Sequence, residues 1–508
     1  MVSSIAVLEM NSKKYFCYFI VFYSILFFIS GCSDREPENN EDIQLRTLIE
    51  KNELSLTSLS NLSVPNIDSP LAQLGKTLFY SKSLGGEEDS ACVTCHHPLL
   101  GGGDNLNLSV GVGAELPNLL GLGRTTTDHS APTVPRNALT VFNIALWEKT
   151  LFWDGRVEVV HNSGLKQINT PDGQPDLSAG DELLFAQAAF PVTSAEEMRG
   201  YFKQTASNDE LRKHLAKRLA DAPDDGDPQL AFSHWPDMFR TVFNQPSASA
   251  SEIITPENIQ LALSAFQRTM LFVDNPWFAY LKGDISALTT QQKRGAILFY
   301  AEKQNGGAHC VSCHSGLLFS DEKLHPLGFP QIGHGKGDGV ADSNGNTDDF
   351  GRYRVTNDIE DIYKFRTPTL LNVAQTAPYG HAGSFNTLKE VIQYSADPLP
   401  SFFTYFQEYK WCQSDQLSRL ASCMDLYPLA KEHTQKSLSA RQTFELQHPI
   451  SITLTNDEIE DIEAFLHTLT DPCILNKECM TPWLYDSSVI NDPDENMLRA
   501  VNESGELL

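Results

Sequence analysis

The sequence CVTCH at residues 92–96 recurs as CVSCH at residues 310–314 in a chain of 508 residues. Two thiols at this spacing can add across the two vinyl groups of one haem, and the histidine that follows can bind its iron. Paired cysteines can also hold zinc, but a zinc site leaves both histidines without a role. We therefore predict two covalently bound c-type haems, held by Cys92, Cys95 and His96 and by Cys310, Cys313 and His314.

The sequences around the two motifs repeat as well. GKTLFY at residues 75–80 precedes the first motif, and GAILFY at residues 295–300 precedes the second. Each unit closes with a threonine-capped helix: residues 255–269 begin Thr-Pro-Glu, and residues 455–468 begin with the capping box Thr-Asn-Asp-Glu. Apolar residues recur at helical spacing in both. The sequence therefore predicts an all-α protein of two cytochrome c-like domains, with the active site facing the domain interface.

The N-terminus resembles a bacterial lipoprotein signal. Lys13 and Lys14 precede an apolar run at residues 15–29, which is short for a bilayer span, and Ile-Ser-Gly-Cys32 follows. A plain secretory signal and an uncleaved anchor are the alternatives. We predict a periplasmic protein that is lipid-anchored to a membrane through Cys32, with the outer membrane favoured because Ser33 is not an aspartate.

The signal and the repeat together divide the chain. Polar residues without a periodic pattern follow Cys32, as in a tether, and residues 157–181 are rich in Gly, Asp, Asn and Pro, which predicts a surface loop. The predicted segments are a signal peptide at 1–31, a tether at 32–65, an N-terminal cytochrome c domain at 66–285, a C-terminal cytochrome c domain at 286–480 and a tail at 481–508.

Four cysteines remain when the haem motifs, Cys17 and Cys32 are set aside. An exported protein can form disulfides, and the local pairs would be Cys412 with Cys423 and Cys473 with Cys479. The sequence alone leaves this connectivity open.

The charge of the chain excludes one class of partner. The formal net charge is −27 and the isoelectric point is near 4.8. No basic stripe is available to neutralise phosphates, so we expect no nucleic-acid partner. The negative charge could steer a basic partner, although it identifies none.

The chain resembles the bacterial di-haem cytochrome c peroxidase family, which includes the MauG-type enzymes. The resemblance runs from about residue 71 to 395 in the order of the family. It is carried by LGKTLFY, CVTCHHP, TVFN, FWDGR, AQAAFPVTSAEEM, QKRGAILFY, CVSCHSG, FRTPTLLN and TAPYGHAGSFNTL. It implies that the N-terminal haem reacts with hydrogen peroxide and that the C-terminal haem receives electrons from outside.

The resemblance also implies roles for three residues of the N-terminal unit. Gln187 and Glu197 match the distal glutamine and glutamate of the peroxide pocket, ten residues apart. A carboxylate is suited to move a proton between the two peroxide oxygens, although a glutamate in this setting can also be an exposed helix residue. Trp153 matches the tryptophan that the family places between its haems, where the alternative is a core aromatic.

Metal ligands follow from the same resemblance. Asn143, Thr376 and Pro378 match an inter-haem calcium site, so we expect one Ca²⁺. Peroxidases of the family use a methionine as the sixth ligand of the C-terminal iron and MauG-type enzymes use a tyrosine. TLKEVIQYSADP contains no methionine, and Tyr394 is the candidate ligand, one residue before the family position.

Four histidines outside the haem motifs carry further expectations. His129 lies upstream of the position of the distal histidine in peroxidases that need reductive activation, which favours an open N-terminal iron. His381 matches a family residue near the haem, and we expect it to support the iron ligands without binding the iron itself. His97 and His161 are expected on the surface.

The sequence thus predicts a di-haem peroxidase that reduces hydrogen peroxide with electrons from a small periplasmic cytochrome or another one-electron donor. One alternative is a MauG-like oxidase of a protein or organic substrate. The other is an electron-transfer lipoprotein without catalytic activity.

Overall fold

The computed structural model describes residues 40–60, 62–127, 132–162, 164–173, 179, 182–224, 226–227, 229–420, 423–486 and 492–508. The predicted signal peptide, Cys17, Cys32 and His129 lie outside this part of the chain. The α-helices are α1 (Asn40–Lys51), α2 (Thr57–Ser60), α3 (Pro70–Tyr80), α4 (Cys92–Cys95), α5 (Leu183–Gln187), α6 (Asn208–Leu219), α7 (Trp235–Val242), α8 (Ala250–Ile253), α9 (Pro256–Arg268), α10 (Pro276–Leu281), α11 (Thr290–Tyr300), α12 (Tyr353–Thr356), α13 (Leu388–Ala396), α14 (Pro398–Gln407), α15 (Cys423–Leu426), α16 (Ala430–Glu445), α17 (Asn456–His467) and α18 (Lys477–Met480).

Short strands and turns complete the secondary structure. The strands are β1 (Thr150–Leu151), β2 (Val157–Asn162), β3 (Leu165–Asn169), β4 (Leu324–His325) and β5 (Phe365–Arg366). A π-helical turn, η5, spans Ala195–Arg199. The 3-10 turns are η1 (Lys82–Leu84), η2 (Pro98–Leu100), η3 (Ile144–Leu146), η4 (Pro191–Thr193), η6 (Ile285–Ala287), η7 (Lys303–Asn305), η8 (Cys310–Ser312), η9 (Ile359–Asp361), η10 (Val373–Gln375), η11 (Lys410–Gln413), η12 (Leu417–Arg419), η13 (Pro472–Leu475) and η14 (Thr481–Trp483).

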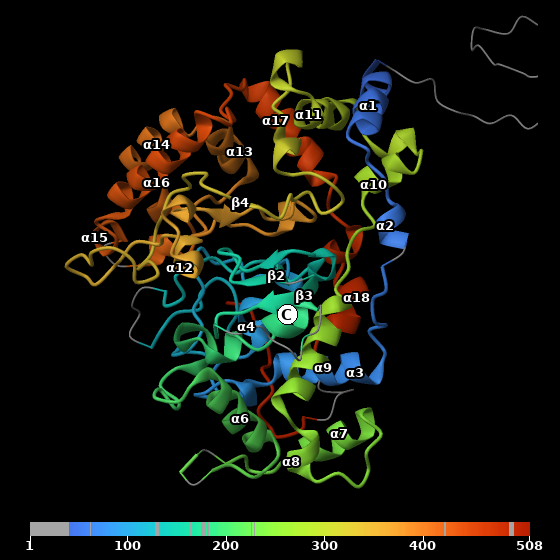
Figure 1. Cartoon of the computed structure of the whole chain (residues 1–508), viewed down its shortest axis with the longest axis vertical. Helices are drawn as coiled ribbons and strands as arrows, with labels where there is room; N and C mark the ends of the chain where they lie inside the picture. The colour runs from blue at the N-terminus through green and yellow to red at the C-terminus, as the bar shows by residue number, and fades with distance from the viewer. Residues whose placement is uncertain are drawn as a thin grey trace, which may run out of the picture.

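The repeat in the sequence forms two equivalent helix crossings. α3 packs across α9, and α11 packs across α17. A Cβ atom at Gly75 would lie 1.9 Å from the carbonyl oxygen of Ala262, and one at Gly295 would lie 1.8 Å from that of Asp461. The repeated glycine is therefore required because the two helix backbones touch at each crossing. Figure 1 shows α3 and α9 in the lower half of the molecule and α11 and α17 in the upper half.

Both predicted closing helices are confirmed within one residue at each end. The Thr255 hydroxyl caps α9 by accepting the amide hydrogen of Asn258, and Thr455 forms the predicted capping box with Glu458 at the start of α17. The fold is predominantly helical, as predicted.

The predicted surface loop at 157–181 is wrong in its first half. β2 and β3 form an antiparallel hairpin, and β1 extends it to a three-stranded sheet. Val157 and Ile168 are fully buried, so one face of the hairpin packs on the core. The β-branched residues Val157, Val159 and Val160 carried this signal, whereas the glycine, aspartate and proline residues that suggested a loop are mostly in the later part.

Each end of the described chain packs on the distant half of the molecule. α1 lies against α11, where Asp42 and Lys293 form a buried ion pair of 2.8 Å. Residues 40–51 of the predicted tether are therefore a packed helix. The predicted tail returns to the N-terminal half, where the Leu498 amide donates to the Tyr80 carbonyl at 2.8 Å, and Figure 1 shows the red end of the chain there.

Apolar residues form three buried clusters. The first joins α3, α6, α7 and α9 with residues 497–500, and the third joins α13 to α16. The second combines α11 and α17 with β1, β2 and α5, so residues 147–190 pack largely with the C-terminal half. The domain boundary at 285/286 stays a prediction.

The disulfides are Cys412–Cys423 and Cys473–Cys479, which confirms both local pairings. Among the described residues, no helix has the length and apolar character needed to cross a membrane.

Candidate active site

Both CxxCH motifs open onto one continuous cavity. Cys92 and Cys95 lie at the two ends of α4, while Cys310 begins η8 and Cys313 follows it, and all four thiols are free. The cavity has a volume of about 650 Å³, and its wall includes all four cysteines, His96 and His314. Among the described residues, no group of potential metal ligands brings the two cysteine pairs together. A four-cysteine zinc site therefore does not form.

Each motif histidine is oriented for iron by a backbone carbonyl. The Nδ1 atom of His96 lies 3.2 Å from the Gly102 carbonyl oxygen, and that of His314 lies 2.9 Å from the Phe319 carbonyl oxygen. A hydrogen bond donated from Nδ1 leaves the Nε2 lone pair available for a metal. Burial lowers the pKa of both imidazoles, which favours the neutral form that a metal requires. The thiols and histidines thus fit two covalently attached haems.

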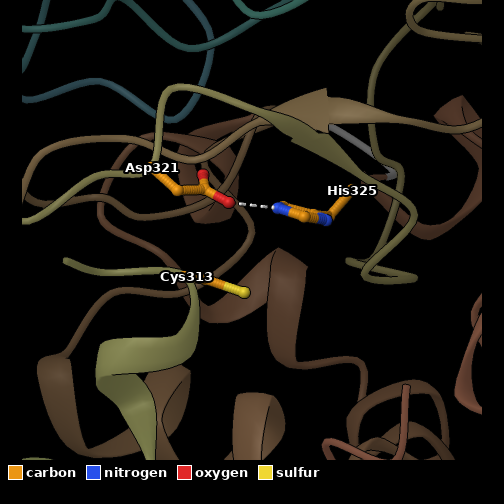
Figure 2. Close-up of side chains that lie close together, drawn as sticks. All are labelled: Cys313, Asp321 and His325. Atoms are coloured by element: carbon orange, nitrogen blue, oxygen red, sulfur yellow. Dashed lines mark hydrogen bonds and ion pairs between the residues drawn. The ribbon is translucent and has the colours of Figure 1, made fainter.

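Figure 2 shows Asp321 and His325 beside the sulfur atom of Cys313. Their ligand atoms lie within 4.8 Å of one another, and Asp321 Oδ2 is 2.8 Å from His325 Nε2. Such a trio could hold a metal ion elsewhere, but here the sulfur is the predicted attachment atom of the C-terminal haem. The carboxylate therefore orients the His325 ring at the wall of the haem site.

Gln187 and Glu197 line the same cavity as His96. Gln187 ends α5, and its Oε1 atom is buried without a hydrogen-bond partner among the described residues. Glu197 lies on η5, a kind of turn that is frequent at functional sites. Burial raises the pKa of Glu197, and the charges of Arg156 and Lys336 oppose this. The carboxyl group is therefore poised to gain and lose a proton closer to neutral pH than an exposed glutamate.

Trp153 also borders the cavity. Its indole Nε1 donates to the Asn137 carbonyl oxygen at 2.9 Å, which fixes the ring in the wall. The next residue joins a buried ionic network in which Arg136 binds Asp154 at 2.7 Å and Asp349 at 2.7 and 2.8 Å. Asp349 belongs to the C-terminal half, so this network ties the two halves together at the cavity.

The structure agrees with some of the predictions for the histidines outside the haem motifs and not with others. His381 lines the cavity, and its ring stacks on Phe365 at a centroid distance of 3.9 Å. His161 is exposed, as predicted. The prediction that His97 lies on the surface is wrong, because the residue is 1% exposed and packs edge-on against Tyr80. Its Nδ1 atom accepts the Leu99 amide hydrogen at 3.2 Å, so it caps η2.

Tyr394, the predicted iron ligand, lies outside the cavity wall. Its hydroxyl donates to the Gly328 carbonyl oxygen at 2.6 Å, inside the third apolar cluster rather than in the cavity. Burial raises the pKa of the phenol. Ser395, at the family position of the ligand, lines the cavity instead.

Asn143, a predicted calcium ligand, also lies outside the cavity wall. Its amide closes two hydrogen bonds with the backbone of Phe272, at 2.7 and 3.1 Å, and the residue is fully buried. Asn372, its counterpart in the second unit, donates to the same carbonyl oxygen at 3.0 Å. The repeated asparagine is therefore a structural residue. Thr376 and Pro378 do line the cavity, where Asn137 accompanies them.

Sequence reasoning missed several polar residues of the wall, among them Arg136, Arg156 and Lys336. Arg136 shortly precedes the TVFN motif and Arg156 is the last residue of FWDGR, which was the available signal. Lys336 lies in a glycine-rich stretch of the C-terminal half, where no pattern distinguishes it from a loop lysine.

Comparisons with known proteins identify relatives of this chain. A sequence profile of the family described as "Di-haem cytochrome c peroxidase" (CCP_MauG) matches residues 69–286. The cytochrome-c peroxidase IdrP1 of Pseudomonas sp. (strain SCT) is 30% identical over 360 residues, which are 67% of this chain and 76% of the relative. The cytochrome c551 peroxidase of Pseudomonas aeruginosa is 30% identical over 320 residues, 63% of this chain and 70% of the relative.

A solved structure shares the fold. The crystal structure of a MauG-like protein associated with microbial copper homeostasis superposes with a TM-score of 0.50 and 23% identity, covering 83% of this chain and 97% of the other. The sequence relatives and the paired CxxCH motifs lead to one conclusion: this chain belongs to the di-haem cytochrome c peroxidase family and is an oxidoreductase of the cytochrome-c peroxidase type.

Proposed function

We propose that the protein reduces hydrogen peroxide to water at its N-terminal haem, with electrons that enter one at a time through the C-terminal haem. The observation that carries the proposal is the presence of Glu197, Gln187 and the His96 ring on the wall of one cavity. The bound haems would supply the electrons and the open metal site at which peroxide is held.

The side chains of the cavity account for the proton chemistry. Glu197, as a carboxylate, takes the proton from the inner oxygen of peroxide and delivers it to the outer oxygen, which leaves as water. Gln187 holds the peroxide through an amide that has a free buried acceptor, Oε1. The raised pKa of Glu197 suits this role because a group that both accepts and donates must not be too strong an acid.

Trp153 is proposed to assist electron transfer between the two haem sites. Its ring belongs to the cavity wall that contains both motifs, and its Nε1 hydrogen bond to Asn137 keeps it in place. The electron donor is proposed to be a small c-type cytochrome or another one-electron carrier of the periplasm, and the lipid anchor on Cys32 remains part of this proposal.

A second candidate function is the oxidation of an organic or protein substrate. It is favoured by α13, which presents Ser395 to the cavity and offers no thioether at the position of the family ligand. A methionine ligand raises the potential of a c-type haem, so its absence weakens the case for a high-potential electron-storing haem. Calcium also stays a proposal, with the carbonyl oxygens of Thr376 and Pro378 as ligands.

Two matched variants test the assignment of the haems. His96→Gly should abolish the absorbance change that peroxide causes in the oxidised protein, whereas His314→Gly should retain that change and lose turnover with a reduced cytochrome. The reverse pattern would contradict the proposal. Pyridine haemochrome spectra and mass spectrometry must first show that both variants carry two covalent haems.

A further inference from the structure

A lysine from the C-terminal half reaches the cavity wall that contains Glu197. The amide of Lys336 donates to the Asp348 carbonyl oxygen at 3.0 Å, and the amide of Gly337 donates to Thr347 Oγ1 at 2.7 Å. A Cβ atom at Gly335 would lie 2.0 Å from the Thr347 carbonyl oxygen, so the two segments touch. These contacts fix the backbone from which the Lys336 side chain extends.

Lys336 differs from the two arginines of this wall in its ion pairing. Arg136 is bound by Asp154 and Asp349, and Arg156 lies 3.2 Å from Asp154 while stacking on a phenylalanine ring. By contrast, the Lys336 ammonium group has no hydrogen bond or ion pair with any residue that the structure describes. A half-buried ammonium group without a partner is costly, and it can bind a ligand in the cavity.

The charges around Lys336 come from both halves of the molecule. Burial lowers its pKa, Arg136 and Arg156 lower it further, and Glu197 and Asp349 raise it. His334 of the same loop also faces this group and feels the charge of Glu196. The ammonium form is therefore lost at a lower pH than that of a free lysine.

We propose that Lys336 is a catalytic residue of peroxide reduction, whose ammonium group donates a hydrogen bond to the outer peroxide oxygen. This inference rests on the proposed function. The O–O bond breaks with its electron pair on the outer oxygen, which receives the proton carried by Glu197 and leaves as water. The two electrons required come from the haems and are replaced by the external one-electron donor, and the inner oxygen takes up two protons from the solvent and leaves as the second water. Lys336 keeps its proton and stabilises the negative charge that develops on the leaving oxygen.

The test compares Lys336→Met, Lys336→Arg and the control Lys323→Met in the holoprotein. Lys323 is an exposed lysine of the C-terminal half outside the cavity wall, so its loss tests the effect of net charge. Removal of an electrostatic donor of this kind costs about 10²–10³-fold in kcat. We expect such a loss for Lys336→Met, partial rescue by Lys336→Arg, and no loss for Lys323→Met.

A second readout does not depend on turnover. Fluoride binds ferric haem as an anion, and a donor beside the open site should stabilise it. Fluoride titration of the oxidised protein should give a dissociation constant roughly 10-fold or more larger for Lys336→Met, the size expected for one hydrogen bond to a charged group. In the parent, activity should fall at alkaline pH as Lys336 deprotonates, and Lys336→Arg should shift this fall to higher pH because guanidinium stays charged.

The outcomes separate the two proposals. If the parent reduces peroxide while Lys336→Met keeps both parental kcat and parental fluoride affinity, the role of Lys336 is refuted and the function stands. If the parent fails to reduce peroxide, the function is refuted, and the fluoride titration still decides whether Lys336 donates to a ligand in the cavity.

Discussion

Asp349→Asn should destabilise the protein because it removes one anion from the buried network at the cavity. The Asp349 side chain is 2% exposed and the Arg136 side chain 6%, and two hydrogen bonds of 2.7 and 2.8 Å join them. Breaking one partner of a buried ion pair costs about 3–5 kcal/mol, because the remaining charge is left uncompensated. Asp154 stays bound to Arg136, so the lower end of that range is expected.

The assay is urea unfolding of the holoprotein followed by far-UV circular dichroism, with Glu503→Gln as the control. Glu503 forms an ion pair with Arg419 in which both side chains are about half exposed, and its loss should change the midpoint little. An Asp349→Asn midpoint equal to that of the control would refute the reasoning.

The effect of Asp349→Asn should depend on pH. Burial alone would raise the pKa of Asp349, but Arg136 outweighs it and holds the pKa below its ordinary value. A carboxyl group with a depressed pKa stabilises the fold fully above its unfolded pKa, about 3.9. This stability is lost as the pH falls through the lower, folded pKa. The difference between parent and variant should therefore be constant near neutral pH and shrink only below about pH 4.

Three further predictions concern the site and the tail. Glu197→Gln should keep both haems and lose about 10²–10⁴-fold of peroxide turnover, and it should abolish the acid limb of the rate profile; a loss under threefold would identify another acid–base group. Tyr394→Phe should leave the absorption and EPR spectra of the C-terminal haem unchanged, whereas a shift would restore the tyrosine as a ligand. Truncation after Tyr485 should lower the unfolding midpoint, because Met497 and Leu498 are buried and each such loss costs about 2–5 kcal/mol; an unchanged midpoint in thermal denaturation would contradict this.

The parts of the fold predicted from the sequence depend on local patterns. The capping residues Thr255 and Thr455 located two helices, because the cap bonds join residues three apart. The repetition of Gly75 as Gly295 predicted two equivalent units, whereas the helix crossings at these glycines became visible only in the structure. The packing of α1 and of residues 492–508 on distant halves could not be predicted, because those contacts depend on partners hundreds of residues away.

The candidate site shows the same limit. Glu197 and Gln187 reached the cavity as expected, since a motif carried them. Tyr394 and Asn143 did not, because a one-residue shift on a helix redirects the side chain by about 100° and because an asparagine amide can bond the backbone instead of a metal. Lys336 comes from the other half of the chain, so its proximity to Glu197 required the tertiary structure.

The ratio of donor to peroxide tests the central claim most directly. A reduced monohaem cytochrome c is mixed with a limiting, known amount of hydrogen peroxide and the all-ferric holoprotein, and its oxidation is followed to completion. The account predicts two molecules of cytochrome oxidised per molecule of peroxide, because reduction of peroxide to water takes two electrons and the donor supplies one at a time. Peroxide-independent oxidation, or no oxidation by a protein that carries both covalent haems, would contradict the account.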